Sequence, residues 1–324
     1  MSAGAATNLV PKGQVGVIGI GNMGLALALN LRDKGWPLRV HDVDPVRLAL
    51  AVQAGLATAA TPAALAAGCA ILLVVVVDAA QAEAVLFGAQ GAAAALRPGS
   101  VVLLCPTISP ADVERLAMRL AALGLACIDA PMSGGPQRAR DGTMSLMVAC
   151  ADPHFNQHQP LLQALASRLF RVGQQPGDGA RTKLVNNLLA AVNLAAAAEA
   201  LALAGQIGLD PALTLAVISQ SSGQSWIGTD RLPRALADDF EPRAHTTLLA
   251  KDSALALTMA HQAGLRPLLG DVAAALFQDA LARGFGGDDD ARMFSLMQAV
   301  LQRGAARPAD PAVVPLLSPG PSSG

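Results

Sequence analysis

The stretch Gln14-Val15-Gly16-Val17-Ile18-Gly19-Ile20-Gly21-Asn22-Met23-Gly24 decides the fold. A short apolar run, typical of a buried strand, passes directly into Gly-x-Gly-x-x-Gly, and an apolar helical pattern follows from Leu25. In a βα unit the first glycine permits a tight turn, the second lets the backbone approach a pyrophosphate, and the third lets helix and strand pack closely. Glycine-rich turns are common, but here the strand, the helix and a carboxylate about 20 residues downstream, Asp42, are all present. The stretch therefore predicts dinucleotide binding, with the phosphates at the helix N-terminus.

Length and composition narrow the class of protein. A chain of 324 residues suits two domains. Hydrophobic residues make up 52% of it, but the excess is alanine, and apolar runs such as residues 70–77 are far shorter than the ~20 residues of a membrane span. The chain opens Met-Ser-Ala-Gly without a basic region or an apolar signal core, so we expect no membrane association and a cytoplasmic location.

Charge and metal-binding residue types exclude further classes. The net charge is −1 without long basic runs, which argues against nucleic acid as a partner. The five histidines form no convincing ligand pair, and the four cysteines show no Cys-x-x-Cys spacing, so no metal is predicted. We interpret the cysteines as buried, reduced thiols: Cys69, Cys105, Cys127 and Cys150.

The first half of the chain alternates strands and helices. The predicted strands are 38–42, 70–77, 101–104 and 126–130, and the predicted helices start at 45 and 62 or span 79–87 and 110–123. This alternation predicts an α/β fold with a doubly wound parallel sheet, in which 143–149 and 169–172 are the last strands.

The second half reads as helices only. The predicted helices are 180–205, 211–220, 246–263, 267–282 and 288–302. The expected domains are a flexible start (1–12), a Rossmann-type dinucleotide-binding domain (13–176), an all-helical substrate and dimerisation domain joined by the long helix (177–305), and a disordered tail (306–324).

Two segments of the predicted sheet domain carry ligand-binding residue types. Asp42 ends the second strand, where a carboxylate accepts hydrogen bonds from the ribose hydroxyls of NAD and repels a 2′-phosphate. Arg39 and Arg47 lie close by, so NADP stays open while NAD is favoured. The segment Asp129-Ala-Pro-Met-Ser-Gly-Gly135 follows a strand end, and Ser133, Gly134 and Gly135 could form a nest for a substrate carboxylate, although alone it would be only a turn.

The long helix carries a lysine in a largely apolar context. Lys183 and Asn187 are four residues apart and share a face. Burial and a nearby cofactor charge could lower the pKa of Lys183 enough for proton exchange with a hydroxyl, whereas without the other motifs it would be a snorkelling surface lysine. For Lys251-Asp252 the usual explanation is surface charge on a helix.

Taken together, these stretches resemble the β-hydroxyacid dehydrogenase family, which includes 3-hydroxyisobutyrate dehydrogenase. The motifs are Gly19-Ile-Gly-Asn-Met-Gly24, residues 129–135, Gly179-Ala-Arg-Thr-Lys-Leu-Val-Asn-Asn187 and Lys251-Asp252, in the order typical of the family. The likeness spans about residues 15–297, nearly the whole chain outside its ends.

The resemblance assigns roles to single residues. Lys183 would be the catalytic acid/base, Asn187 the partner of the substrate hydroxyl or a water, and Lys251 a residue at the nicotinamide end of the cleft. Ser133, Gly134, Gly135 and Trp226 would bind substrate. The cofactor-binding residues would be Gly19, Ile20, Gly21, Asn22, Met23, Gly24, Asp42, Asp78, Thr107 and Lys251. Pro106 departs from the small hydroxyl residue often found before that threonine, so one cofactor contact would be absent.

The implied reaction is the reversible NAD-dependent oxidation of a hydroxyl β to a carboxylate, by a homodimer or homotetramer. Residues 77–88 and 221–226 look more like the L-threonate dehydrogenase branch, although Asp78 replaces its usual Asn, so a four-carbon sugar acid is the first substrate expectation and 3-hydroxyisobutyrate the second. A tartronate-semialdehyde or succinic-semialdehyde type of reductase stays open. The 6-phosphogluconate dehydrogenases have a histidine where Asn186 stands, and imine reductases and non-catalytic relatives lack the lysine that is present as Lys183.

Overall fold

The structure, a computed structural model, describes residues 13–305. The expected flexible start (1–12) and disordered tail (306–324) lie outside the described residues. Contacts divide the described chain into two units, which are treated separately below. The first holds residues 13–192 and 241–290, and the second holds residues 193–240 and 291–305.

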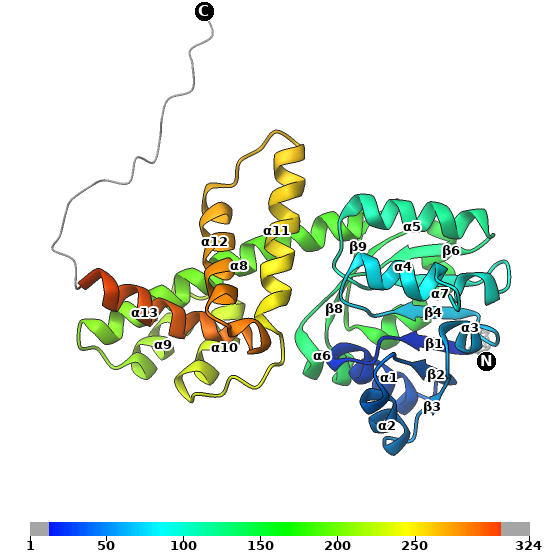
Figure 1. Cartoon of the computed structure of the whole chain (residues 1–324), viewed down its shortest axis with the longest axis horizontal. Helices are drawn as coiled ribbons and strands as arrows, with labels where there is room; N and C mark the ends of the chain where they lie inside the picture. Colours follow the sequence, from blue (N-terminus) through cyan, green and yellow to red (C-terminus); the bar gives the residue numbers. More distant parts are fainter. Residues whose placement is uncertain (1–12, 306–324) are drawn as a thin grey trace, which may run out of the picture. The chain divides into compact units, whose positions relative to one another are not determined.

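The first unit is built on one mostly parallel sheet in the order β3-β2-β1-β4-β5-β6-β8-β7, with β9 paired to β8 (Figure 1). Its strands are β1 (Val15–Ile18), β2 (Leu38–His41), β3 (Ala57–Thr58), β4 (Ile71–Val74), β5 (Val101–Leu104), β6 (Ala126–Asp129), β7 (Met132–Ser133), β8 (Ser145–Ala149) and β9 (Arg168–Gly173). Since β2, β1, β4, β5 and β6 are parallel neighbours, their carboxyl ends meet at one edge. The predicted Rossmann-type sheet is confirmed, and β1 lies inside it, between β2 and β4.

One end of the sheet departs from the expected parallel order. Strand β8 runs antiparallel to β6 and to the short β7. The cause is the short helix α6 (Gly135–Asp141), which ends at Gly142 in the left-handed conformation and turns the chain back without a full crossover. The sequence analysis missed α6, β7 and β3 because each is short and has no clear apolar period.

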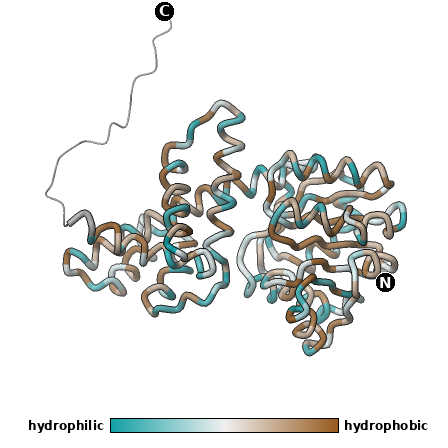
Figure 2. The backbone as a smooth tube through the Cα atoms, in the orientation of Figure 1, coloured by the Kyte–Doolittle hydropathy of each residue, from teal (hydrophilic) through white to brown (hydrophobic). Residues whose placement is uncertain are grey.

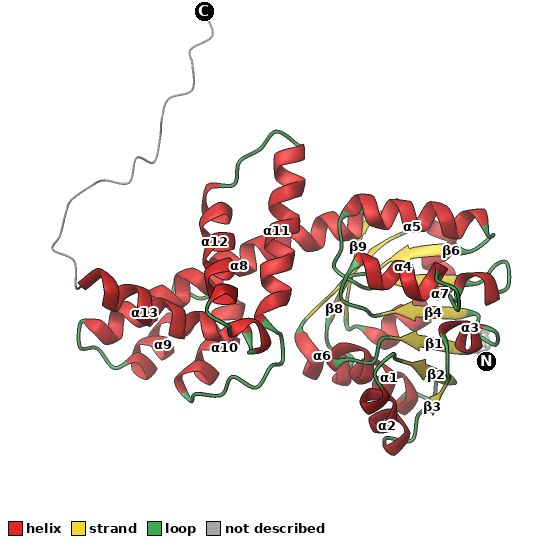
Figure 3. Cartoon of the chain, viewed as in Figure 1, coloured by secondary structure: helices red, strands yellow, loops and turns green. Residues whose placement is uncertain are grey.

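Helices cover both faces of the sheet (Figure 3). Alternate strand residues point to opposite faces: Ile71 and Leu73 belong to the core beneath α1, and Leu72 and Val74 to the core beneath α3 and α4. In Figure 2 the tube is mostly brown along these strands, as expected for strands buried on both faces. The covering helices are α1 (Asn22–Asp33), α2 (Pro45–Gln53), α3 (Pro62–Ala66), α4 (Ala79–Phe87), α5 (Pro110–Ala122), α6 and α7 (Asp152–Leu165).

Residues 178–305 are mostly helical, as predicted. The helices are α8 (Asp178–Gln206), α9 (Pro211–Ser219), α10 (Trp226–Leu236), α11 (Thr246–Gln262), α12 (Leu268–Ala282) and α13 (Met293–Ala305). The sequence analysis missed α10, whose Ser225 cap and internal Pro233 resemble a loop by composition. The predicted helix 288–302 begins only at Met293 because the Asp289 carboxylate accepts hydrogen bonds from the backbone N–H groups of Arg243 and Ala244, which fixes the preceding residues in short turns.

Helix α8 is the only helix among residues 13–305 that is long and apolar enough to cross a membrane, judged by length and composition alone. The sequence analysis predicted this helix as 180–205 but cited only shorter apolar runs, such as residues 70–77, against a membrane span. The core helix of a soluble protein passes the same test, and 39% of the apolar window of α8 is buried.

Candidate active site

The glycine turn between β1 and α1 is shaped to approach a phosphate. Gly19 has a φ of +87°, and a Cβ built on Gly24 would overlap the carbonyl oxygen of Gly19, so the turn requires glycine at both positions. At Gly21, by contrast, a built Cβ meets nothing within 4 Å. Gly21 also caps α1 without a side-chain hydrogen bond. No side chain caps the start of α1, and the space beside Gly21 is open, which fits a dinucleotide pyrophosphate at this helix N-terminus.

The carboxylate of Asp42 is tied to this turn. Its Oδ2 accepts a hydrogen bond from the backbone N–H of Ile20 at 2.7 Å, and its Oδ1 accepts one from the N–H of Asp44 at 2.9 Å. Carboxylate oxygens accept more than one hydrogen bond each, so Asp42 keeps acceptor capacity for ribose hydroxyls. Arg39 donates to the carbonyl oxygens of Thr58 and Ala64. Arg47 lies 3.5 Å from the side-chain oxygen of Asn22.

Two further predicted cofactor residues follow the carboxyl ends of neighbouring strands. Asp78, after β4, accepts a hydrogen bond from the N–H of Gln81 at 2.8 Å and caps α4. Thr107, after β5, offers its carbonyl oxygen to Nζ of Lys251 at 2.5 Å. Because β1, β4 and β5 are parallel, both residues lie at the same sheet edge as the glycine turn, where open α/β sheets bind their ligands.

The predicted acid/base lies buried on α8. Lys183 is 8% exposed and Asn187, one turn further along the helix, is 9% exposed. Burial lowers the pKa of Lys183 to about 8, the nearby Asp252 carboxylate opposes this shift, and the Lys251 ammonium adds to it. A lysine with such a pKa exchanges protons near neutral pH, which an exposed lysine cannot do efficiently.

Asp252 connects the predicted site residues, a role that the sequence analysis missed. Its Oδ2 accepts a hydrogen bond from Nδ2 of Asn187 at 2.6 Å, and its Oδ1 accepts one from Nζ of Lys251 at 2.7 Å. The interpretation of Lys251-Asp252 as surface charge is wrong for Asp252, which is buried. No local signal reveals this contact because Asn187 is 65 residues away in the chain.

The predicted carboxylate nest lies directly after β6. Ser133 ends β7, and Gly134 and Gly135 have φ values of +132° and +77°, in a region that favours glycine. All three are half-buried. A Cβ built on Gly134 would approach Cδ of Arg138 at 3.0 Å, so this arginine side chain passes beside the turn.

Trp226 belongs to the second unit, whereas Lys183, Asn187, Asp252, Lys251 and Thr107 belong to the first. It begins α10, and the guanidinium of Arg231 lies 6.0 Å from the centre of its ring. Its assignment to the substrate site stays a prediction.

The cysteines are free thiols, and Cys127 is only half-buried, whereas the other three are buried. Burial raises the pKa of Cys105 to about 12 and that of Cys150 to about 11, which keeps these thiols protonated and unreactive. Within residues 13–305 no group of three or more His, Cys, Asp or Glu side chains could hold a metal ion.

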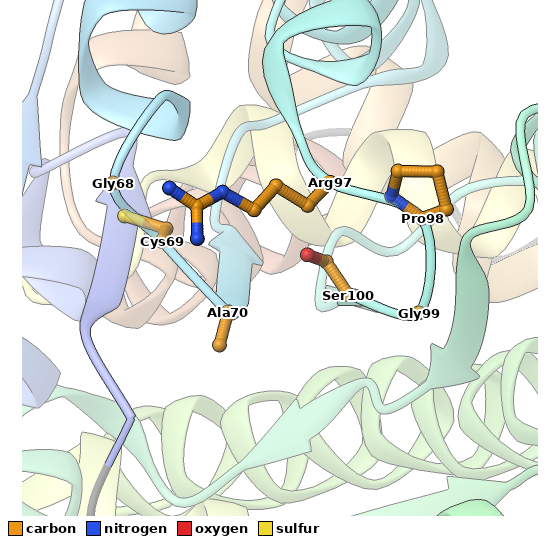
Figure 4. A pocket seen from close by; sticks show the side chains of 7 residues that line it. All are labelled: Gly68, Cys69, Ala70, Arg97, Pro98, Gly99 and Ser100. Carbon is orange, nitrogen blue, oxygen red and sulfur yellow. The ribbon is translucent and has the colours of Figure 1, made fainter.

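A cavity of about 320 Å³ is lined by none of the predicted cofactor, substrate or catalytic residues. It is lined by residues 68–70 and 97–100, which immediately precede β4 and β5 (Figure 4). It is therefore at the amino edge of the sheet, opposite the edge that carries the glycine turn. Parallel α/β sheets bind ligands at the carboxyl edge, so this cavity is not the active site.

Comparison with known proteins decides the family. Residues 14–173 match the model of the NAD binding domain of 6-phosphogluconate dehydrogenase, and residues 177–297 match the model for NAD-binding of NADP-dependent 3-hydroxyisobutyrate dehydrogenase. The chain is 38% identical to the L-threonate dehydrogenase of Cupriavidus necator over 292 residues, which is 90% of this chain and 98% of the relative. The chain belongs to the 3-hydroxyisobutyrate dehydrogenase-like β-hydroxyacid dehydrogenase family.

The predicted family and enzyme class are thereby confirmed: the chain is an NAD(P)-dependent hydroxyacid dehydrogenase. It is also 31% identical to bovine (Bos taurus) mitochondrial 3-hydroxyisobutyrate dehydrogenase over 305 residues, 92% of this chain and 90% of the relative. Among solved structures, a 3-hydroxyisobutyrate dehydrogenase from Salmonella typhimurium has a TM-score of 0.82 and 33% identity, covering 87% of this chain and 99% of that one.

Proposed function

We propose that this dehydrogenase uses NAD to oxidise the hydroxyl of a small 3-hydroxy acid, first of all a four-carbon sugar acid such as L-threonate, with Lys183 as the general acid/base. The observation that carries the proposal is the buried Lys183, with a pKa of about 8, on the same helix face as Asn187. Such a pair can hold a hydroxyl and exchange its proton at neutral to alkaline pH.

The choice of substrate is supported by the relatives. Bacterial L-threonate dehydrogenases are 33–38% identical to the chain, whereas mammalian 3-hydroxyisobutyrate dehydrogenases are 30–32% identical. The 3-hydroxyisobutyrate reaction is the second candidate, because the same buried lysine would serve both substrates.

The choice of NAD over NADP is supported by Asp42. Its carboxylate is fixed to the glycine turn by the N–H of Ile20, at the end of β2. A fixed negative charge there accepts ribose hydroxyls and repels a 2′-phosphate. The guanidinium of Arg39 already donates hydrogen bonds to two carbonyl oxygens of the protein, so it has fewer N–H groups left for a 2′-phosphate.

The residues of the site divide the chemistry between them. When bound, the nicotinamide supplies a hydride acceptor. The neutral amine of Lys183 takes the hydroxyl proton, and the resulting ammonium stabilises the negative charge that develops on the oxygen. Asn187, oriented by Asp252, binds the hydroxyl. Lys251 holds the loop at Thr107 by donating a hydrogen bond to the carbonyl oxygen of Thr107. The Ser133–Gly135 turn would bind the substrate carboxylate, which is the role that the resemblance to the family assigns to it.

We also propose that the enzyme assembles as a homodimer or homotetramer through its helical part. In the first unit, α8 exposes Val185 and Leu189, and α12 exposes Leu268, Leu269 and Val272. A Cβ built on Gly270 would approach Leu188 at 3.0 Å, so these two helices pack together. Apolar side chains exposed on neighbouring helices are typical of a surface that another subunit covers.

The proposal is tested by initial rates at alkaline pH with NAD or NADP, using L-threonate, D-threonate, D-glycerate, 3-hydroxyisobutyrate and serine. We expect the highest kcat/KM with L-threonate and NAD. Selective turnover of 3-hydroxyisobutyrate would keep the mechanism and replace the substrate. A chain that binds NAD but turns over none of these acids would contradict the proposed function.

A further inference from the structure

The buried carboxylate of Asp129 has no part in the chemistry described so far. Asp129 is the last residue of β6 and is 1% exposed. Its backbone pairs with β5 on one side and with β8 on the other, so its position is fixed by the sheet. A carboxylate this deeply buried is costly unless it is well hydrogen-bonded.

Its hydrogen bonds go to the start of α8, about 50 residues further along the chain. Oδ2 of Asp129 accepts from the backbone N–H of Gly177 at 2.8 Å and from that of Ala180 at 3.1 Å. The first N–H groups of a helix have no partner within the helix, and a negative charge there also interacts favourably with the helix dipole. Asp129 thus caps α8 from another element.

The fit between the carboxylate and the helix is close. A Cβ built on Gly179 would come within 2.8–2.9 Å of the carboxyl atoms of Asp129, so a side chain at this position would push the helix away. Gly177 has a φ of +103°, which lets the chain turn its N–H toward the same oxygen. The start of α8 is therefore held against the end of β6.

Lys183 lies on the face of α8 that this contact fixes. Gly179, Lys183 and Asn187 follow one another at four-residue intervals, so they form one stripe along the helix. The stripe touches Asp129 at Gly179 and Asp252 at Asn187, and Lys183 lies between them, about 6 Å along the axis from each neighbour. A shift of the first turn would move the amine directly.

We propose that Asp129 is a positioning residue for Lys183: its buried carboxylate holds the first turn of α8 at the end of β6 and so fixes where the amine lies. The inference rests on the proposed role of Lys183 in proton exchange. It implies that the protonated Asp129, which offers fewer acceptor sites to the two N–H groups, holds the helix less firmly.

The ionisation of Asp129 gives this proposal a distinctive readout. Burial raises the pKa of Asp129 to about 6, the backbone hydrogen bonds from α8 oppose the shift, and the charge of Asp178 adds to it. The other titratable groups that face it are the thiols Cys105, Cys127 and Cys150, whose own pKa values Asp129 helps to raise. In the reductive direction Lys183 must be protonated, so the rate falls above about pH 8. It should also fall below about pH 6, where Asp129 becomes protonated.

The test compares Asp129→Asn with the wild type in the reductive direction, from about pH 5 to about pH 9, with NADH and the oxo acid formed by the oxidation. We expect kcat to fall by about 10- to 100-fold, because small displacements of a catalytic group have effects of this size. KM should change little, the acid limb should disappear and the alkaline limb should stay. An unchanged kcat with the acid limb still present would overturn the proposal.

Two further variants separate positioning from general damage. Asp178→Asn removes a charge from the same helix start and should retain kcat, while the acid limb moves to lower pH. Gly179→Ala leaves the carboxylate intact but displaces the helix, so it should reproduce the loss of kcat even if Asp129→Asn fails to fold. A Gly179→Ala variant with normal kcat would also overturn the proposal.

A measurement that needs no turnover separates this proposal from the proposed function. Hydrogen exchange of a peptide covering residues 176–186 should be faster in Asp129→Asn than in the wild type, because the cap is weakened. If exchange is faster in Asp129→Asn but the wild-type protein has no hydroxyacid activity, the proposed function is contradicted and the helix contact made by Asp129 is supported. Unchanged exchange in Asp129→Asn would contradict the proposed role of Asp129 in holding the first turn of α8.

Discussion

Lys183 is the proposed general acid/base, and its surroundings favour the neutral amine. It is buried, and its pKa of about 8 lies well below that of an exposed lysine. For oxidation the amine must be neutral, so we expect kcat/KM to rise with pH and to level off above about pH 8. Ordinary titration of an exposed lysine would put this limb above pH 10.

Replacing Lys183 tests this assignment. In Lys183→Ala we expect kcat to fall by ~10²- to 10⁴-fold, the usual contribution of a general acid/base. NAD affinity should be retained, since the contacts that fit the dinucleotide lie at the glycine turn and Asp42. Lys183→Arg is the matched control: it keeps a cation but cannot accept a proton, so it should be equally slow. Turnover near the wild-type level in either variant would refute the mechanism.

Asp252 acts on the same amine through its charge. Its carboxylate raises the pKa of Lys183, against the effect of burial. In Asp252→Asn the pKa of Lys183 should therefore fall further, and the acid limb of the oxidation profile should move to lower pH. Asn187 and Lys251 also lose their shared charged partner, so kcat should decrease.

The matched control for Asp252→Asn is Asp279→Asn on α12. Asp279 forms a half-buried pair with Arg283, the residue that follows the end of α12. Such pairs contribute ~0–1 kcal/mol, so the control should leave both rate and pH profile unchanged. Equal profiles for the two variants would mean that Asp252 does not tune Lys183.

At the scale of elements, the glycine turn and helix α1 act as one unit. In Gly24→Ala the new Cβ would overlap the carbonyl oxygen of Gly19, and such overpacking costs about 1–3 kcal/mol. We expect a lower Tm together with weaker NAD binding, measured by thermal melting and by fluorescence titration.

Gly21→Ala provides the contrast within the same turn. Its new Cβ meets no protein atom within 4 Å, and Gly21 has an ordinary φ of −61°. Tm should therefore stay close to that of the wild type, while the methyl group obstructs the phosphate and weakens NAD binding. Normal NAD affinity in Gly21→Ala would show that the phosphates lie elsewhere.

At the scale of the whole molecule, the exposed apolar side chains of α12 and α8 bear on assembly. If a second subunit covers them, Leu269→Glu should shift the mass measured by light scattering toward the monomer, because a buried, unpaired carboxylate is costly. Met118→Glu on α5 is the control, since it changes an equally exposed apolar residue on a helix other than those two. A wild-type protein that is monomeric at assay concentrations would contradict the proposed assembly.

Much of this architecture was accessible from the sequence because its signals are local. The glycine turn, the apolar strands and the proline-started helices α2, α3 and α5 all lie where the pattern put them. Helix α10 was not predictable, because Ser225 and Pro233 are residues typical of loops. The chain reversal at α6 was not predictable either, because a helix of seven residues is too short to show a helical period of apolar residues. The direction of β8 depends on that reversal and was therefore also missed.

The sequence by itself determined the family and the dinucleotide turn, because each rests on contiguous motifs whose chemistry depends on neighbouring residues. It also singled out Lys183, Asn187 and Asp42 as the predicted site residues. Only the tertiary structure decided how the amine is tuned and held. Burial lowers the pKa of Lys183, Asp252 links Asn187 to Lys251, and Asp129 caps a helix that begins about 50 residues later. Burial and hydrogen bonds between distant segments arise from packing. They cannot be predicted from the spacing of residues within one segment of the sequence.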